Sequence, residues 1–291
     1  MTPTSSNTDQ AISICTSVGF RWLSSTDYLN AIKRLRPDIV IGLTDVANSN
    51  PPSIKRLEKT VIRTSRWTEQ LFAELSKLRT EGQSSSTHIF APVLPLSYEK
   101  QYEQFEILQE NLGKGLTGLA LHDCKIIESL PTHFLPLPRL SLSTCANVTD
   151  LLQAVATGSD IVTVPFLDKA TDAGVAVTFS FPAEVATAAK RKLVAGIDLW
   201  QELHATDMSP IEDDCPCYTC RKHHRAYIHH LLKTKEMLAW VLLQIHNYWT
   251  LEKLFEGIRS SIENGSFETE RANFWSVYES GLIQGSGLGP R

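Results

Sequence analysis

The chain has 291 residues, of which 42% are hydrophobic and 21% charged, so it can bury a sizeable core without disulfide bonds. With 28 basic and 32 acidic residues the net charge is −4, which excludes a molecule-wide basic field for nucleic acid and leaves only local patches. The sequence begins without a basic segment followed by an apolar run, and it lacks any apolar stretch of about 18 residues, so it predicts neither a secretory signal nor a membrane span.

Short apolar runs alternate with helical patterns through the first two thirds of the chain. Strands are expected at 38–43, 88–93, 116–121, 139–142, 160–164 and 175–181. Helices are expected between them at 53–78, 99–112 and 148–157. This alternation indicates βα units and a parallel sheet covered by helices, which is an α/β fold.

The pattern divides the chain into four parts. Residues 1–24 are polar and predict a disordered N-terminus, and residues 25–182 carry the alternating strands and helices. Residues 183–265 predict a helical region, which includes a helical insertion at 183–205. Residues 266–291 form a C-terminal tail in this division.

The segment DDCPCYTCRKHHRAYIHH, residues 213–230, is rich in metal-ligating side chains. Cys215, Cys217 and Cys220 form a C-x-C-x-x-C motif, and three thiolates so close in sequence can wrap one ion. A tetrahedral zinc site needs a fourth ligand, and the candidates are His223, His224, His229, His230 and His246. Such a closed site has no open position for chemistry, so it would be structural. A redox-active CxxC is the alternative, but the third cysteine favours metal.

The other three cysteines are Cys15, Cys124 and Cys145. They are spread along the chain and are expected to be ordinary thiols. Clustering of the remaining cysteines, without a secretory signal, indicates a reducing compartment.

The stretch CPCYTCRKHHRAYIHHLLKTKEMLAWVLLQIHNYW resembles the C-terminal zinc region of the tRNA-guanine transglycosylases, also called queuine tRNA-ribosyltransferases. The resemblance implies that Cys215, Cys217, Cys220 and His246 bind one structural Zn²⁺. It also implies a TIM-type (β/α)8 barrel with an attached zinc-binding helical subdomain. Members of the family exchange guanine for a queuine-type base at the tRNA wobble position through a covalent aspartyl intermediate.

The resemblance extends upstream and covers about residues 25–265. LRPDIVIGLTDV, which contains Asp45, is similar to the strand whose acidic residue contacts the base. LTGLALHD resembles the Gly-rich base-binding strand, and LPRLSLSTCANVTDLLQAVATGSDIVTVPF resembles the segment that carries the nucleophile. About six strands are expected where a closed barrel needs eight, so the first two βα units of the barrel are expected to be missing.

The catalytic pattern of the family is altered in this chain. In the stretch that resembles G-x-D-x-x-D-C-V-x-P-T-R, Asp160 matches the first aspartate and Thr163 occupies the nucleophile position. A threonine without an activating base does not replace a carboxylate nucleophile. The D-S-G-G-[FY]-Q segment is absent from the sequence. The ending GVAVTFSFP resembles the non-catalytic accessory subunit of the eukaryotic heterodimeric enzyme, which implies a catalytic partner subunit and tRNA bound through the complex.

Two other functions stay open at this point. One is an active base-exchange enzyme that uses Asp45 or Asp160, although both residues can instead be local hydrogen-bonding groups at strand ends. The other is a zinc-held scaffold that binds protein and no RNA. The basic clusters 33–36, 55–59 and 190–192 are candidate RNA contacts or solvated helix faces. A cytoplasmic location is expected, and the resemblance implies a peripheral place at the mitochondrial outer membrane.

Overall fold

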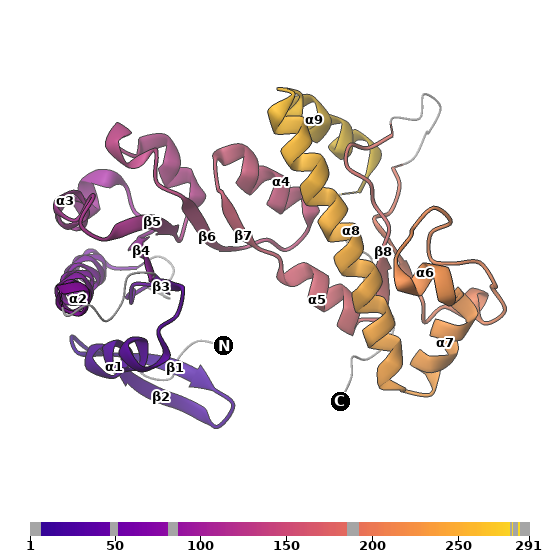
Figure 1. Cartoon of the computed structure of the whole chain (residues 1–291), viewed down its shortest axis with the longest axis horizontal. Coiled ribbons are helices and arrows are strands. Elements are labelled where there is room, and N and C mark those ends of the chain that lie inside the picture. The colour runs from indigo at the N-terminus through magenta and orange to yellow at the C-terminus, as the bar shows by residue number, and fades with distance from the viewer. Residues whose placement is uncertain are drawn as a thin grey trace. The chain divides into compact units, whose positions relative to one another are not determined.

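The computed structural model describes residues 7–46, 52–80, 87–184 and 192–279, together with Gly281 and Gly285 (Figure 1). The strands are β1 (Ala11–Thr16), β2 (Gly19–Ser24), β3 (Ile39–Ile41), β4 (His88–Val93), β5 (Leu116–Leu121), β6 (Arg139–Thr144), β7 (Ile161–Thr163), β8 (Val175–Val177) and β9 (Gly196–Asp198). The α-helices are α1 (Ser25–Leu35), α2 (Ile54–Thr80), α3 (Tyr102–Glu110), α4 (Val148–Thr157), α5 (Pro165–Asp172), α6 (Tyr218–Lys222), α7 (Arg225–Lys233), α8 (Met237–Glu263) and α9 (Phe267–Val277). Short 3-10 helices lie at Tyr98–Gln101, Cys124–Ser129, Thr132–Phe134 and Glu202–His204.

The described chain divides into two compact units. Unit 1 consists of Met1–Ser143 and Thr157–Thr163, and unit 2 consists of Thr144–Ala156 and Val164–Arg291. Each unit has its own buried apolar cluster. The two units are described separately below.

A parallel sheet is the centre of unit 1. Over the described residues its strand order is β3-β4-β5-β6-β7, and the pairs β3–β4, β4–β5 and β5–β6 are parallel. These strands confirm the α/β alternation that the sequence predicts. β4 and β5 are buried along nearly their whole length, as strands covered on both faces are.

Close packing between β4 and β5 depends on a glycine. The ring of Phe90 on β4 lies across Gly118 on β5, where a Cβ would approach the ring to 2.4 Å. Leu71 and Phe72 of α2, with Phe105 of α3, belong to the apolar core that includes these strands. The sequence predicts both helices because their apolar residues recur at helical spacing.

The N-terminal segment differs from the expected disorder. Within residues 7–24 the structure forms an antiparallel hairpin of β1 and β2, in which Ile12 pairs with Leu23 and Cys15 with Phe20. Gly19 makes the turn possible with a φ of 104°. The hairpin explains the alternating apolar residues of AISICT, which the overall polarity of the segment hides. Residues 1–6 lie outside the described residues.

Unit 2 is built around the long helix α8. β8 and β9 pair in antiparallel fashion beside it, and α5, α6 and α7 contact α8. The sequence analysis is wrong for 192–205, which it expects to be helical, because these residues form β9 and a 3-10 helix. Residues 185–191 of that expected insertion lie outside the described residues, and the expected tail contains α9.

Candidate functional site

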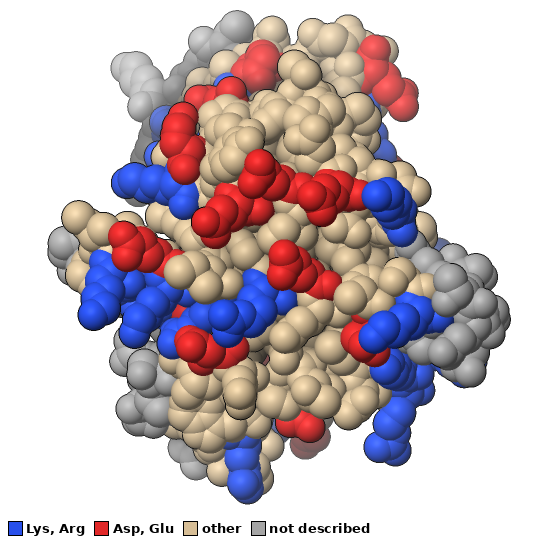
Figure 2. All heavy atoms as spheres, turned by 90° about the vertical axis from the view of Figure 1, so that its left-hand side faces the viewer, with Lys and Arg blue, Asp and Glu red and all other residues tan. Residues whose placement is uncertain are grey.

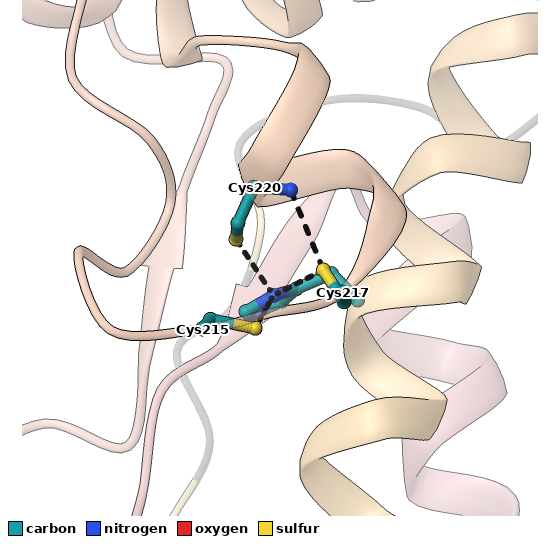
Figure 3. Close-up of side chains that lie close together, drawn as sticks. Cys215, Cys217 and Cys220 are labelled. Carbon is teal, nitrogen blue, oxygen red and sulfur yellow. Dashed lines mark hydrogen bonds between the residues drawn. The ribbon is translucent and has the colours of Figure 1, made fainter.

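Three cysteines and one histidine meet in unit 2 (Figure 3). Cys215 and Cys217 lie in the loop before α6, Cys220 lies in α6, and His246 lies near the middle of α8. Cys217 is the N-cap of α6, and its Sγ accepts the backbone N–H of Cys220 at 3.4 Å. This cap holds two of the three sulfurs on the same side of the first helical turn.

The spacing of these four side chains is that of a tetrahedral metal site. Nδ1 of His246 lies 3.7 Å from Sγ of Cys215, 3.7 Å from Sγ of Cys217 and 3.4 Å from Sγ of Cys220. Zn–S and Zn–N bonds of about 2.3 and 2.0–2.1 Å at the tetrahedral angle place sulfur and nitrogen about 3.6 Å apart. All four ligand atoms lie within 4.8 Å of one another, so the residues fit a zinc ion by both donor type and distance.

A backbone carbonyl orients the imidazole. Nε2 of the fully buried His246 donates to the carbonyl oxygen of Val177 in β8 at 3.0 Å. This hydrogen bond places the proton on Nε2 and turns Nδ1 toward the sulfurs. Metal-bound histidines in proteins usually have such a partner for the second ring nitrogen. Glu212 lies 3.9 Å from the same Nε2 and adds a negative charge beside the ring.

Hydrogen bonds and charges within the cluster shift the pKa values of its members. The Cys220 thiol donates to Cys217 and, despite burial, lowers the pKa of the Cys217 thiol well below its usual range. The pKa of Cys220 is raised because it donates this hydrogen bond and because burial opposes a second thiolate. Burial lowers the pKa of His246, but the nearby Cys215 and Cys217 raise it more, to about 9. A metal ion held by these side chains would displace their protons.

Asn247, beside His246, fastens α8 to β8. Its side-chain oxygen accepts the backbone N–H of Val177 at 2.9 Å. Its amide nitrogen donates to Oγ1 of Thr171 at 2.9 Å and to the carbonyl oxygen of Val175 at 3.0 Å. The sequence analysis gives this asparagine no role, although the adjacent His-Asn pair is a visible signal. Both residues of the pair bind the backbone of β8.

The other four candidate histidines are used elsewhere. His223 stacks on Tyr227, and His224 caps α7 by accepting the Tyr227 N–H at 3.0 Å. Nδ1 of His229 donates to the carbonyl oxygen of Leu199 at 2.9 Å, and His230 is exposed on α7. Geometry thus selects His246 from the five histidines that spacing alone leaves open.

Asp45, which follows β3, is enclosed by cationic and polar side chains. It has no exposed surface, and its carboxylate accepts from Arg56 at 2.5 and 2.6 Å, from Arg63 at 3.0 Å and from Nδ2 of Asn7 at 2.7 Å. Burial raises the pKa of Asp45, but the bonds from Arg56, Asn7 and Arg63 lower it more. The carboxylate is therefore charged and has its oxygens occupied, which leaves no free acceptor for a base.

Asp160 and Thr163 lie at the two ends of β7. Asp160 accepts the backbone N–H of Arg139 at 2.9 Å and its Nε at 3.0 Å, so it joins β7 to the start of β6. Its side chain is 46% exposed, and its role is local hydrogen bonding. Thr163, at the position that the resemblance assigns to the nucleophile, is exposed at the end of the strand.

The basic clusters have different surroundings. Lys33 forms an ion pair with Glu74 at 2.8 Å, whereas Lys55 and Lys59 are exposed on α2. Lys192 donates to the carbonyl oxygen of Trp275, and residues 190 and 191 lie outside the described residues. Arg34 and Arg36 of the first cluster are exposed like Lys55 and Lys59.

The helices in the described ranges were also compared with the thickness of a membrane. None of them combines the length and the apolar character that a bilayer span requires.

Comparison with known proteins gives consistent matches along the chain. The sequence model of the family "Queuine tRNA-ribosyltransferase" matches residues 1–280. The chain is 37% identical over 281 residues to the "Queuine tRNA-ribosyltransferase accessory subunit 2" of Schizosaccharomyces pombe, which covers 96% of this chain and 62% of that protein. Proteins of the same name from Drosophila virilis and Anopheles gambiae are 31% and 29% identical, over 90% and 88% of the chain. The chain spans 62–65% of the length of these three relatives.

Proposed function

Because the chain belongs to the queuine tRNA-ribosyltransferase family, we propose that it is a non-catalytic accessory subunit of a heterodimeric enzyme that exchanges guanine for queuine in tRNA. The observation that carries this proposal is the state of the two carboxylates that the resemblance marks. Asp45 is buried between Arg56 and Arg63, and Asp160 is bound to Arg139.

Base exchange through a covalent intermediate needs a free carboxylate nucleophile and a second acid/base group. Asp45 is fully buried and hydrogen-bonded on both oxygens, so it would have to break ion pairs before it could attack. Asp160 directs its oxygens at the backbone N–H and side chain of Arg139. An active enzyme that uses either residue is therefore the weaker alternative.

The sheet of unit 1 fits the family fold. We propose that β3 to β7 are consecutive strands of a TIM-type (β/α)8 barrel, with α2 and α3 on its outer face. In this arrangement the carboxyl ends of the strands carry Asp45, His122 and Thr163. Barrel enzymes use that edge for chemistry, and here it holds no unpaired carboxylate among these residues.

One Zn²⁺ is proposed to be bound by Cys215, Cys217, Cys220 and His246. The ion would supply a structural crosslink, because four protein ligands complete its tetrahedral shell. His246 would extend that crosslink to β8 through Val177. The zinc subdomain is thus the region in which the cysteine loop, α8 and β8 are held together.

The proposed surface for the catalytic subunit is the exposed apolar face of α8. This face consists of Leu238, Val241, Ile245 and Tyr248, which recur at helical spacing and are 38–51% exposed. A groove of about 590 Å³ lies alongside, lined by residues of α8 and by Pro216–Tyr218 of the cysteine loop. An exposed apolar patch of this kind is typical of a protein interface, and the cysteine loop borders it.

Native mass spectrometry of the chain co-expressed with a catalytic subunit of the family tests this proposal. The expected product is a one-to-one heterodimer that contains one zinc ion in this chain and exchanges the base in tRNA. The chain alone should show no exchange, and any exchange by it would overturn the assignment. Val241→Asp with Ile245→Asp should weaken the heterodimer, whereas Ile62→Asp on α2 serves as a control of similar exposure.

A salt series of tRNA binding distinguishes the accessory subunit from the alternative, a protein-binding scaffold that does not bind RNA. Binding through phosphates weakens with salt by roughly 0.7–0.9 log units per log unit for each contact. If the accessory subunit contacts tRNA through Lys55 and Lys59, their replacement by Ala should flatten the salt dependence of the heterodimer. An unchanged dependence would favour the scaffold.

The proposed location is the cytoplasm or the mitochondrial outer surface, which fractionation of tagged protein would distinguish.

A further inference from the structure

Unit 1 has an apolar groove that lies apart from the surface proposed for the catalytic subunit, although two lysines beside it, Lys55 and Lys59, are also the tRNA contacts tested above. It lies between α2 and the segment formed by the 3-10 helix Tyr98–Gln101 and the start of α3. Its volume is about 630 Å³. The lining residues are Ile54, Leu57, Glu58, Val61, Ile62, Leu96, Glu99, Lys100, Tyr102 and Glu103.

Large apolar side chains at the groove are open to solvent. Ile54 is 78% exposed, Ile62 is 49% exposed and Tyr102 is 50% exposed. Isolated apolar residues are ordinary on a surface, but a contiguous apolar patch with a polar rim indicates a binding site. On α2 the lining runs from Ile54 to Ile62, which is about 12 Å of helix, or two turns.

Charges of opposite sign follow the two sides of the groove. On the α3 side, Glu99, Glu103, Glu106 and Glu110 recur at spacings of four, three and four and are all exposed. On the α2 side, Lys55, Lys59 and Arg66 recur at spacings of four and seven and are also exposed. Figure 2 shows this face, with acidic atoms in a row at the height of α3 and basic atoms below them.

These two rows are not neutralised by each other. Within the described residues, no ion pair includes any member of the acidic row Glu99, Glu103, Glu106 and Glu110 or of the basic row Lys55, Lys59 and Arg66. The rows therefore keep charges exposed to an outside molecule, although the Glu106 carboxylate also accepts a hydrogen bond from the Tyr102 hydroxyl. An occupant of matching polarity would gain both apolar burial and two lines of opposite charge.

We propose that this groove binds an amphipathic helix of a partner protein, with an apolar ridge between a basic flank and an acidic flank. The ridge would lie on Leu57, Val61 and Ile62, and the basic flank would face the glutamates of α3. The acidic flank would face Lys55, Lys59 and Arg66. Recognition of this kind uses apolar anchors at helical spacing, with charges that set the orientation of the helix.

The shape and charge of the groove favour a helix over other occupants. One wall is α2 and the other is the 3-10 helix with the start of α3, so an added helix can pack along α2, whereas an added strand would need a sheet edge. A nucleic acid would bring phosphates against Glu58, Glu99 and Glu103, which line the groove itself. The groove lies in unit 1, and the surface proposed for the catalytic subunit lies in unit 2.

A designed peptide is the probe for this site. It is a helical peptide of about five turns with a leucine ridge, lysines on one flank and glutamates on the other. The control peptide has the same composition with the leucines dispersed around the helix. Fluorescence anisotropy of the labelled peptide against the whole chain should show saturable binding that weakens with salt. The control peptide should not saturate.

Two variants locate the binding, and neither replaces a buried residue. Ile62→Asp should weaken the peptide affinity at least about tenfold, because it puts a charge into the apolar lining on which the leucine ridge of the peptide would lie. Glu103→Lys with Glu106→Lys should do the same, and a peptide with two acidic flanks should regain affinity for that variant. Val241→Asp on α8 is the matched control, with 51% exposure against 49% for Ile62, and should leave peptide binding unchanged.

Other results would overturn the proposal. Equal binding of the ridge and dispersed peptides would mean charge attraction alone, and loss of binding in Val241→Asp would place the peptide on α8. Sedimentation that shows a dimer of this chain, abolished by Ile62→Asp, would mean that a second copy occupies the groove. None of these measurements includes tRNA or the catalytic subunit, so the result is independent of the proposed function.

Discussion

At the scale of single residues, Asp45 stands out as a fully buried carboxylate of unit 1. It is a charge without solvent, kept ionised by two arginines that come from one face of α2. Buried ion pairs add little net stability over apolar packing, but removal of one partner leaves the other charge uncompensated. In this chain the residue joins the segment after β3 to α2 and to the segment before β1.

Asp45→Ala should therefore lower the free energy of unfolding, because Arg56 and Arg63 lose their buried counter-charge. Arg63 keeps its exposed partner Asp9, so the loss should lie at the lower end of about 3–5 kcal/mol. Urea unfolding followed by fluorescence measures this. Asp160→Ala is the control, since its ion pair with Arg139 is partly exposed and should contribute at most about 1 kcal/mol. Equal effects of the two substitutions would contradict the central role of Asp45.

The same carboxylate predicts an acid dependence of stability. Its pKa is lowered in the folded chain, so its contribution is fully present above the pKa of the unfolded state, about 3.9. The contribution is lost as the pH falls through the lower folded pKa. The difference in stability between wild type and Asp45→Asn should thus be constant from pH 7 to about 5 and shrink below about pH 4. A difference that grows on acidification would contradict this.

The proposed zinc site makes a specific prediction for His246. His246→Ala removes the nitrogen that faces three sulfurs and also the bond to Val177, so the zinc content of purified protein should fall from one ion per chain to a small fraction. His230→Ala, an exposed residue of α7, should leave metal content unchanged. Elemental analysis distinguishes the two outcomes. Full zinc content in His246→Ala would exclude it as a ligand.

At the scale of elements, the docking of α8 on β8 depends on Asn247. Asn247→Ala removes three buried hydrogen bonds and leaves Val177 N–H and Val175 C=O without these partners. At about 1 kcal/mol for each bond, the loss is about 3 kcal/mol. Unfolding of unit 2 by urea measures it, with Gln244→Ala on the exposed side of the same helix as control. Zinc content should persist in both variants.

The sequence predicts the strands from β3 to β8 as short runs between helical patterns. The signal is strongest for β4 and β5, because burial on both faces of a parallel strand produces continuous apolar runs. It does not predict β1 and β2. A two-stranded hairpin needs only alternating apolar residues, and the polar residues between them make the whole segment read as disordered. Residues 192–205 were expected to be helical, yet Gly196 lies so close to Ala176 that a Cβ would approach its carbonyl oxygen to 2.9 Å. Contacts between distant segments decide such positions.

The metal cluster was partly predictable for a related reason. The three cysteines are close in sequence, so local spacing identifies them. The histidine, His246, lies 26 residues beyond Cys220 and in another helix. Resemblance to the family was needed to select it. The arginines around Asp45 were not predictable, because Arg56 and Arg63 lie 11 and 18 residues away and meet it only after α2 packs on the sheet.

At the scale of the whole molecule, the candidate metal ligands and the parallel sheet belong to different compact units. All four candidate ligands lie in unit 2, and the parallel sheet lies in unit 1. Removal of zinc with a chelator should raise amide hydrogen exchange in α6, α7 and α8, because the ion stabilises the fold of its ligands. Protection of β4 and β5 should stay the same. A uniform loss of protection would mean that the chain unfolds as one cooperative body.

The adjacent positions of His246 and Asn247 have a consequence for how α8 can vary. One faces the sulfurs and β8, and the other faces β8 and α5, so the rotation of the helix about its axis is fixed at this point. One added or deleted residue within a helix turns everything beyond it by about 100°. Length changes between Met237 and His246 would therefore misdirect both side chains at once, while substitutions on the outer face would not. Between Met237 and His246, the number of residues in the helix is therefore more tightly restrained than the identity of the residues on its outer face.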